Sequence, residues 1–212
     1  MNPATAVSLW QSSLEAFREK AASRDPAVAA VAVASVSASC AISLVVMVLE
    51  ITENRKNFQG DRKRLEALVE AARTESDRLA RYADEDPAAY AHYVRCLRMP
   101  KDTESERVHR DQAIASALRR ATEVPLSAAR AAMAGLNVCA EAAELAHGAV
   151  ATDLGGAAQL LAGAVRAMLL SVDANLAALG ESEYADQIAA ECSELEERAD
   201  RQAQAVRKRV TS

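Results

Sequence analysis

AVAAVAVASVSASCAISLVVMVL, residues 27–49, is a run of 23 positions without a charged side chain. As an α-helix it extends roughly 34 Å, enough to cross the hydrocarbon core of a bilayer, which is about 30 Å thick. Its composition argues against that role, because Ala and four serines dilute the Leu and Ile that favour insertion, and no aromatic belt flanks the run. We therefore predict that this run forms a buried core helix and that the protein has no membrane partner.

Three of the serines, Ser35, Ser39 and Ser43, recur every four residues and share one face of this helix. Small side chains on a shared face let a second helix approach closely. Because membrane helices use the same pattern, a membrane protein with one spanning helix and a helical cytoplasmic domain remains an alternative. Solubility without detergent separates the two interpretations.

The composition of the chain favours helices throughout. Half of the 212 residues are hydrophobic but only 3% are aromatic, and Gly and Pro are few. A core of small aliphatic side chains needs long helices in close contact, and often a second subunit to complete the burial. We predict an all-α protein, a single domain over residues 1–212, in which long helices surround the small-residue helix and two copies form a homodimer.

Capping and turn residues divide the rest of the chain. Prolines predict a helix restart at Asp86-Pro87 and a kink or break at Pro125. Thr152 or Asp153 is expected to cap a helix that ends at Gly180. The last, highly charged segment is expected to project from the body. The expected helices cover residues 4–22, the uncharged run, a stretch from 61 onward, 87–99, 105–122, 124–147, 154–179 and 182–209.

Charge and cysteine spacing exclude several classes of protein. A net charge of −5, with both signs mixed along the chain, argues against a nucleic-acid partner. The four cysteines are dispersed and form no zinc-spaced cluster with histidine, so no metal site is predicted. Dispersed thiols and the absence of a signal-peptide pattern indicate the reducing cytoplasm. Neither a phosphate-binding glycine loop nor a Ser-His-Asp pattern is present.

A series of short motifs follows in fixed order along the chain. They are Pro26 to Thr52, Arg55-Lys56, Asp86 to Tyr90, Met99 to Lys101, Arg110 to Leu126, Thr152-Asp153 and Val172 to Leu176. Together these segments resemble the cyclodeaminase/cyclohydrolase family, which includes the cyclodeaminase part of formiminotransferase-cyclodeaminase and bacterial methenyltetrahydrofolate cyclohydrolases. The resemblance covers almost the whole chain. It implies a dimeric helical fold, with sites near the subunit boundary, that acts on the one-carbon bridge of tetrahydrofolate without another cofactor.

The chain departs from the family pattern at several positions. The three consecutive glycines of the family are Ala29, Ala30 and Val31 here. Glycine at a helix start lets a ligand approach bare backbone N–H groups, which a Cβ atom obstructs. Glu50 and Ser171 stand where the family has asparagine. The resemblance therefore implies the fold more strongly than the chemistry.

The sequence offers six candidate site residues, most of which also have a purely structural explanation. Asp153 and Lys56 are the catalytic candidates, although Asp153 fits an N-cap equally well and Lys56, like Arg55, fits the C-terminal end of a helix dipole. Asn175, on an otherwise apolar helix, needs either a ligand or a packing hydrogen bond. The candidates for substrate binding are Arg55, Asn175, Glu50 and Thr52.

Two functions follow from the resemblance. The first is a folate one-carbon enzyme, either a methenyltetrahydrofolate cyclohydrolase or a formiminotetrahydrofolate cyclodeaminase. The second is a diverged member that has lost folate binding and serves as a dimeric scaffold or in a different cyclisation or hydrolysis. Loss of the glycines predicts weak folate binding, which distinguishes the diverged member from the folate enzyme.

Overall fold

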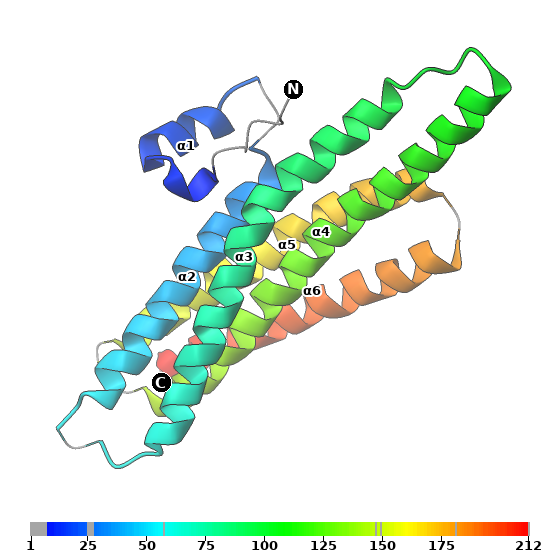
Figure 1. Ribbon diagram of the computed structural model, residues 1–212. Coiled ribbons are helices and arrows are strands. Elements are labelled where there is room, and N and C mark those ends of the chain that lie inside the picture. The colour runs from blue at the N-terminus through cyan, green and yellow to red at the C-terminus, as the bar shows by residue number, and fades with distance from the viewer. Residues whose placement is uncertain are drawn as a thin grey trace.

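The structure, a computed structural model, describes residues 8–24, 28–56, 58–146, 148, 150–180 and 182–211. Five long helices run side by side in an elongated bundle (Figure 1). The described residues contain no strand, and the prediction of an all-α bundle is confirmed. In chain order the elements are η1 (Leu9–Gln11), α1 (Leu14–Ala21), α2 (Ala30–Glu53), α3 (Arg62–Leu97), α4 (Glu104–Leu145), α5 (Ala151–Leu179) and α6 (Glu183–Val210).

Polar side chains cap the N-termini of three of the long helices. The Asp61 carboxylate accepts the backbone N–H groups of Lys63 and Arg64 at the start of α3. Thr103 and Glu106 form a reciprocal capping box at the start of α4, and the Ser182 hydroxyl accepts the backbone N–H of Ala185 at the start of α6. These caps satisfy N–H groups that have no partner inside the helix.

The helix restart predicted at Asp86-Pro87 and a break at Pro125 are both wrong, whereas a kink at Pro125 stays a prediction. α3 continues through Pro87 and α4 continues through Pro125, so the segments 87–99, 105–122 and 124–147 are parts of two longer helices. Each proline removes one helical hydrogen bond. Contacts with neighbouring helices on both sides of the proline hold the helix together, since Ala83 and Ala89 are buried around Pro87 and Val124 and Leu126 around Pro125.

Two further boundaries differ from prediction. α5 begins at Ala151 with Val150 as its N-cap, so Thr152 and Asp153 lie within the first turn and do not cap it. α6 does not project, because its apolar stripe packs on α4 and α5. Gly180 does end α5, with a positive φ of 72° that favours glycine. The start of α2 predicted at Asp25-Pro26 lies outside the described residues, which have Ala29 as the N-cap.

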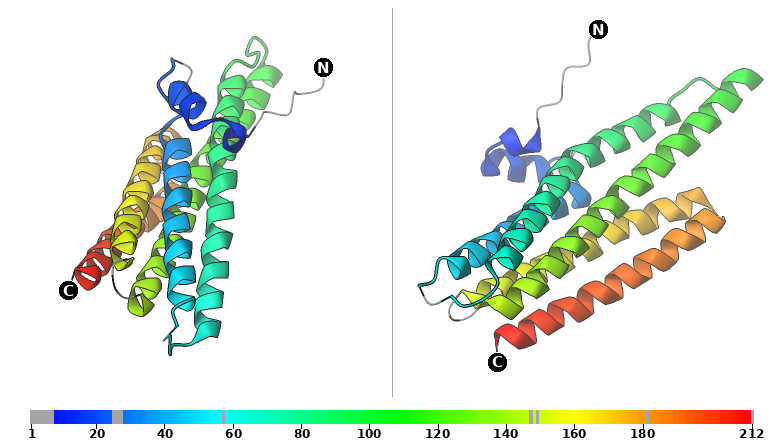
Figure 2. Two further views of the ribbon diagram at one scale, coloured as in Figure 1. Left: turned by 90° about the vertical axis from the view of Figure 1, so that its left-hand side faces the viewer. Right: turned by 60° about the horizontal axis from the view of Figure 1, so that its bottom comes forward.

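α2 packs between α3 and α5 and also reaches α4 (Figure 2). Ser35 and Ser39 are buried, as the close approach of a neighbouring helix requires, and the hydroxyls of Ser39 and Ser76 on α3 lie 2.7 Å apart. Ser43, one turn further on, is exposed. The small-residue face is therefore in contact with α3 over only part of its length.

The N-terminal segment docks on α3. The Ser8 hydroxyl and the Leu9 backbone N–H both donate to the Asp84 carboxylate, at 2.6 and 2.8 Å. The indole N–H of Trp10 donates to the carbonyl of Ala80 at 3.0 Å. One turn of α3 therefore holds η1 in place.

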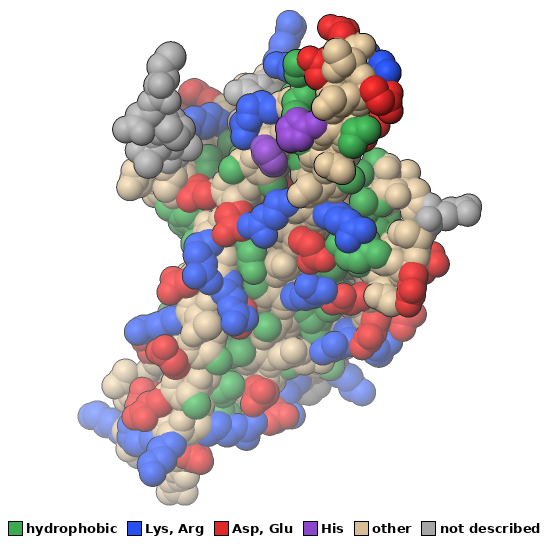
Figure 3. Space-filling model, turned by 45° about the vertical axis from the view of Figure 1, so that its right-hand side comes forward, with side chains coloured by type: hydrophobic (Ala, Val, Ile, Leu, Met, Phe, Trp, Pro, Cys, Tyr) green, Lys and Arg blue, Asp and Glu red, His purple; other side chains and the backbone are tan. Residues whose placement is uncertain are grey.

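The surface of the bundle carries both charged side chains and large apolar ones. Figure 3 shows acidic and basic side chains interspersed over the face that it presents, and ion pairs such as Arg130–Glu191 link α4 to α6. α2 and α5 instead expose Val33, Met47, Leu160 and Leu170. Both helices are long and apolar enough to cross a membrane by length and composition alone, and 56% and 39% of their most apolar windows are buried within the bundle.

Candidate functional site

A cavity of about 350 Å³ lies where the first turn of α2 meets α3, α4 and α5. This volume falls in the range of small-molecule sites. Its lining residues come from four of the sequence motifs, which lie far apart along the chain. Its lining residues are Ala29, Ala30, Val31, Asp86, Tyr90, Tyr93, Ala121, Ser171, Ala174 and Asn175.

Asp86 is the ionisable group of this cavity whose acidity the fold changes most. It lies in the interior of α3, directly before Pro87, and is partly buried. Burial disfavours the charged carboxylate and raises the pKa of Asp86 to about 6. A carboxyl group with such a pKa takes up and releases protons near neutral pH, as a general acid or base must.

Two tyrosines share the α3 wall with Asp86. Tyr90 and Tyr93 follow at spacings of four and seven residues, which places all three side chains on one helix face. Tyr90 remains 47% exposed, and Tyr93 is half-buried. An aromatic wall beside a carboxyl group suits a flat heterocycle that stacks on the rings and hydrogen-bonds at its edge.

The opposite wall comes from α5 and α4. Ser171 and Asn175 lie one turn apart on α5, and the Asn175 Nδ2 donates to the carbonyl oxygen of Ala121 on α4 at 2.8 Å. The packing hydrogen bond that the sequence left as one of two alternatives therefore exists. Asn175 also lines the cavity, so the other alternative, contact with a ligand, stays a prediction.

The start of α2 forms the remaining side. The N-cap residue Ala29 has no side-chain acceptor for the first N–H groups of this helix. Val31 is buried, whereas Ala29 and Ala30 are exposed. Their three Cβ atoms occupy the place where the resembling family has bare glycine.

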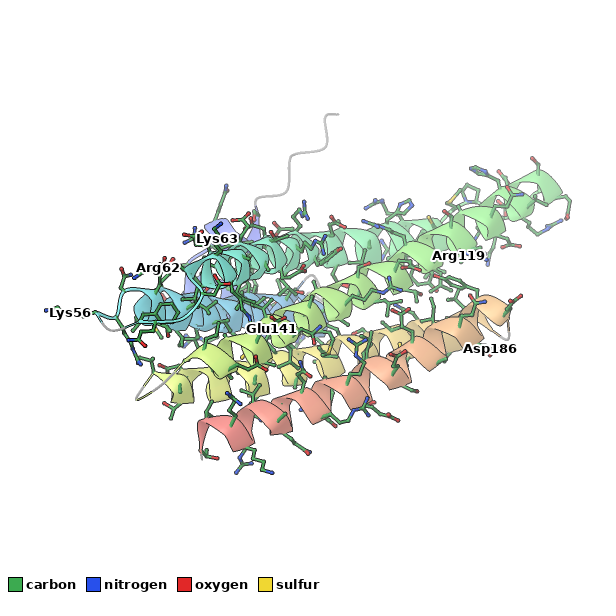
Figure 4. All side chains as sticks on the ribbon, turned by 90° about the horizontal axis from the view of Figure 1, so that it is seen from below. Lys56, Arg62, Lys63, Arg119, Glu141 and Asp186 are labelled. Carbon is green, nitrogen blue, oxygen red and sulfur yellow. The ribbon has the colours of Figure 1, made fainter. Side chains whose placement is uncertain are left out.

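Four of the predicted site residues lie at the other end of the bundle, around the α2–α3 and α4–α5 connections. The Thr52 hydroxyl is buried and donates to the carbonyl of Val48 at 2.7 Å. Arg55 lines a separate hollow with Thr52 and Gly60. Lys56 is exposed and points away from the bundle (Figure 4). Asp153, in the first turn of α5, is partly buried.

Glu50 forms an exposed ion pair with Arg73 of α3 at 2.7 Å. It lies near the last turn of α2, and a helix of 24 residues is roughly 36 Å long. A single chain therefore does not bring Asp153, Lys56, Arg55, Glu50 or Thr52 to the cavity. Of the predicted residues, Asn175 is the one that lines it.

Sequence reasoning missed Asp86, Tyr90 and Tyr93 as site residues. The pair Asp86-Pro87 predicts a helix start, because Asp before Pro is typical of one. The spacing of four and seven residues was the available signal, since it places one carboxyl and two aromatic rings on a single helix face.

No cysteine is among the lining residues of this cavity. Among the described residues, no group of three or more His, Cys, Asp or Glu side chains has metal-binding geometry. Burial raises the pKa of Cys139 to about 12 and that of Cys192 to about 11, which keeps both thiols protonated. Cys96 is also buried, and Cys40, on α2, is exposed.

The fold defines an all-helical protein, with a cavity of small-molecule size between its helices. The chain belongs to the formiminotransferase-cyclodeaminase family, whose model matches residues 13–194.

Relatives and a solved structure agree with this assignment. The formimidoyltransferase-cyclodeaminase of Sus scrofa is 28% identical over 96% of this chain, but the chain spans only 38% of that relative's length. The methenyltetrahydrofolate cyclohydrolase of Methylorubrum extorquens is 25% identical over 82% of this chain and 84% of its own. The formiminotetrahydrofolate cyclodeaminase of Thermotoga maritima shares the fold, with a TM-score of 0.84 at 24% identity over 95% of this chain and 97% of that one.

Proposed function

We propose that the protein acts on the one-carbon bridge of a tetrahydrofolate, with the reacting ring in the cavity beside Asp86. The observation that carries the proposal is the convergence of a carboxyl group with a pKa of about 6, two tyrosines and the Asn175 amide on one cavity. The names of the relatives supply the substrate class, and the cavity supplies a proton-transfer group with matching acidity.

In the hydrolytic reaction, water adds to the methenyl carbon that links N5 and N10. The Asp86 carboxylate takes one proton from the attacking water as the C–O bond forms. The bond from carbon to N5 then breaks, and N5 receives the proton that Asp86 holds. The remaining hydroxyl proton leaves to solvent, and a formyl group stays on N10.

In the cyclodeaminating reaction, N10 attacks the carbon of a formimino group on N5. The N10 proton moves to the former imino nitrogen, and protonated Asp86 supplies a second proton. Ammonia then leaves, and the cationic methenyl bridge remains. Both reactions require one carboxyl group that is readily protonated and deprotonated, so the cavity suits either.

The size of the cavity limits what it holds. About 350 Å³ accommodates a bicyclic ring system, and the aminobenzoyl-glutamate portion extends out of the opening. Negatively charged glutamyl groups favour basic side chains, which form charge-assisted hydrogen bonds with carboxylates. Arg55 and Lys56 meet that requirement chemically, although they lie at the far end of the same chain.

A homodimer resolves this separation. The outer face of α2 has two hollows. One is shared with α5 and lined by Val33, Leu160 and Ala167, and the other is lined by α2 alone, including Met47 and Ile51 beside Glu50. A twofold axis across the middle of α2 pairs this face with itself in antiparallel fashion. The α2–α3 connection of one subunit then lies near the cavity of the other, so Lys56 and Asp153 of the partner subunit complete the site. We propose that the protein forms this dimer and is soluble and cytoplasmic.

The experiment that tests the function follows the loss of the methenyl chromophore, or the release of ammonia from formiminotetrahydrofolate, in the presence of purified protein. Asp86→Asn should lower turnover at least a hundredfold, because general acid–base groups contribute roughly 10²–10⁴. The matched control is Asp77→Asn, an exposed carboxylate on the same helix. Equal loss in both variants, or none in either, contradicts the role of Asp86.

Cys40 provides the test of the dimer. It is the exposed thiol on α2, whereas the other three cysteines are buried. Light scattering should give twice the chain mass, and a maleimide should modify Cys40 more slowly as the protein concentration rises. A monomer at micromolar concentration, or recovery of the protein only with membranes, overturns the proposed assembly.

The alternative function, a family member that does not bind folate, also needs a test. The Cβ atoms of Ala29, Ala30 and Val31 border the cavity, and Val31 is buried. If calorimetry detects no binding of tetrahydrofolate and neither reaction occurs, the chain is a family member that keeps the fold for a scaffold role or for another cyclisation or hydrolysis.

A further inference from the structure

Pro125 leaves one carbonyl in α4 without its helical donor. In an α-helix each carbonyl accepts from the N–H four residues later, and proline has no N–H. The affected carbonyl is that of Ala121, which lines the cavity and is only 9% exposed. A buried carbonyl needs a replacement donor.

Asn175 supplies the donor from another helix. Its Nδ2 lies 2.8 Å from the Ala121 oxygen. This bond fixes which way the amide faces, because a carbonyl oxygen can only accept and the amide must present its nitrogen to it. The remaining polar atom of Asn175 is Oδ1, an acceptor, on a side chain that lines the cavity.

We propose that Pro125 is a positioning residue that orients Asn175, and that Asn175 Oδ1 accepts a hydrogen bond from a ring N–H of the ligand. The identity of the ligand rests on the proposed function, whereas the orientation of the amide rests on the helix geometry alone. With Asp86 on the opposite wall, the cavity offers acceptors to a heterocycle that carries N–H donors along its edge. A reduced pterin ring has such an edge.

Two variants separate the orienting bond from the recognition of the ligand. Pro125→Ala returns an N–H to the Ala121 carbonyl and so makes the bond from Asn175 dispensable. Asn175→Ala should lower the folding equilibrium constant about tenfold in the native background, but less than twofold when Pro125 is also replaced. Equal losses in the two backgrounds would show that Pro125 does not create the need for Asn175.

Calorimetry with tetrahydrofolate tests recognition. Asn175→Ala should weaken binding about tenfold in both backgrounds, because Oδ1 is lost in each, and Pro125→Ala alone should weaken it a few-fold, because the amide can then turn. The matched control is Asn137→Ala, an asparagine on α4 that accepts a hydrogen bond from Gln202 on α6. This control should affect stability and leave affinity unchanged.

A deaza analogue with C–H in place of one ring N–H should lose less affinity from Asn175→Ala than tetrahydrofolate does, if that N–H is the donor. If tetrahydrofolate binds and Asn175→Ala leaves its affinity unchanged, the recognition role is wrong. If the native protein binds no tetrahydrofolate, the proposed function and the ligand contact fail together, and the stability measurements alone decide whether Pro125 orients Asn175.

Discussion

At its first turn α2 borders a cavity with a partly buried carboxyl group, whereas at its last turn it ends among exposed charges. Asp86 at the first end has a pKa raised by burial, while Glu50 at the other end is ion-paired with Arg73 in solvent. The hollow at the first end contains this partly buried carboxyl group, whereas the hollow at the other end is lined by Thr52, Arg55 and Gly60. The desolvated carboxyl group and the charged family motif therefore point to opposite ends of α2.

The largest expected effect tests whether the two ends act together. Lys56→Ala and Asp153→Asn should each lower turnover roughly a hundredfold if the partner subunit brings these groups to the cavity, the size typical of proton-transfer groups. Mixing the Lys56→Ala protein with the Asp86→Asn protein and allowing subunits to exchange should restore part of the activity. Restoration is impossible if each chain works alone. Unchanged turnover in both single variants would confine the site to the cavity end.

The next effect concerns the stability of the protein as a function of pH. The pKa of Asp86 is raised in the folded state, so the folded chain holds this proton more tightly than the unfolded chain. The carboxyl group costs no stability below pH 4, and its cost grows between pH 4 and 6 and stays constant above. The pKa is raised by about two units. Asp86→Asn should therefore increase the free energy of unfolding, relative to the native protein, by up to roughly 3 kcal/mol at pH 8 and by little at pH 4, as measured by urea unfolding.

The control for this measurement is Asp77→Asn, which should show no such difference between the two pH values. Turnover of the native protein in the hydrolytic direction should rise with pH through about 6, because the carboxylate form accepts the proton. An activity that is independent of pH between 5 and 8 would contradict Asp86 as the base.

A smaller effect is expected from restoring glycine at the start of α2. Replacing Ala29, Ala30 and Val31 together by Gly should raise the affinity for tetrahydrofolate several-fold, because backbone N–H groups become accessible. Loss of the buried Val31 side chain should cost about 1–3 kcal/mol in stability. Calorimetry and urea unfolding measure the two quantities. Tight binding by the native sequence would show that the Cβ atoms do not obstruct the ligand.

The smallest effect is expected at Glu50. Its ion pair with Arg73 is exposed on both sides, and such pairs contribute about 0–1 kcal/mol. Glu50→Gln should therefore change the free energy of unfolding by less than about 1 kcal/mol and leave ligand affinity unchanged. A loss of affinity of tenfold or more would instead place Glu50 in a shared site.

The fold was largely predictable from the sequence, because helix periodicity and caps are local. The uncharged run predicted α2, and Gly180 marked the end of α5. The prolines misled, because the cost of one lost hydrogen bond is local, while the packing that keeps α3 and α4 continuous comes from helices distant in sequence.

The site was less predictable for the same reason. Asp86 carries no sign in the sequence that it is desolvated, since the helices that enclose it come from residues near 30, 121 and 171. Asn175 was identified because a polar residue on an apolar helix is visible locally. The family motifs named Lys56 and Asp153 but carried no information on their distance from the cavity.

The docking of η1 gives this protein a built-in optical reporter. Trp10 is its single tryptophan, and its indole N–H is bonded to the Ala80 carbonyl, about a turn and a half of α3 before Asp86. Fluorescence of the unlabelled chain therefore reports on one place, the contact between the N-terminal segment and the helix that carries Asp86. A ligand that shifts this turn of α3 should change the emission without any dye or engineered probe.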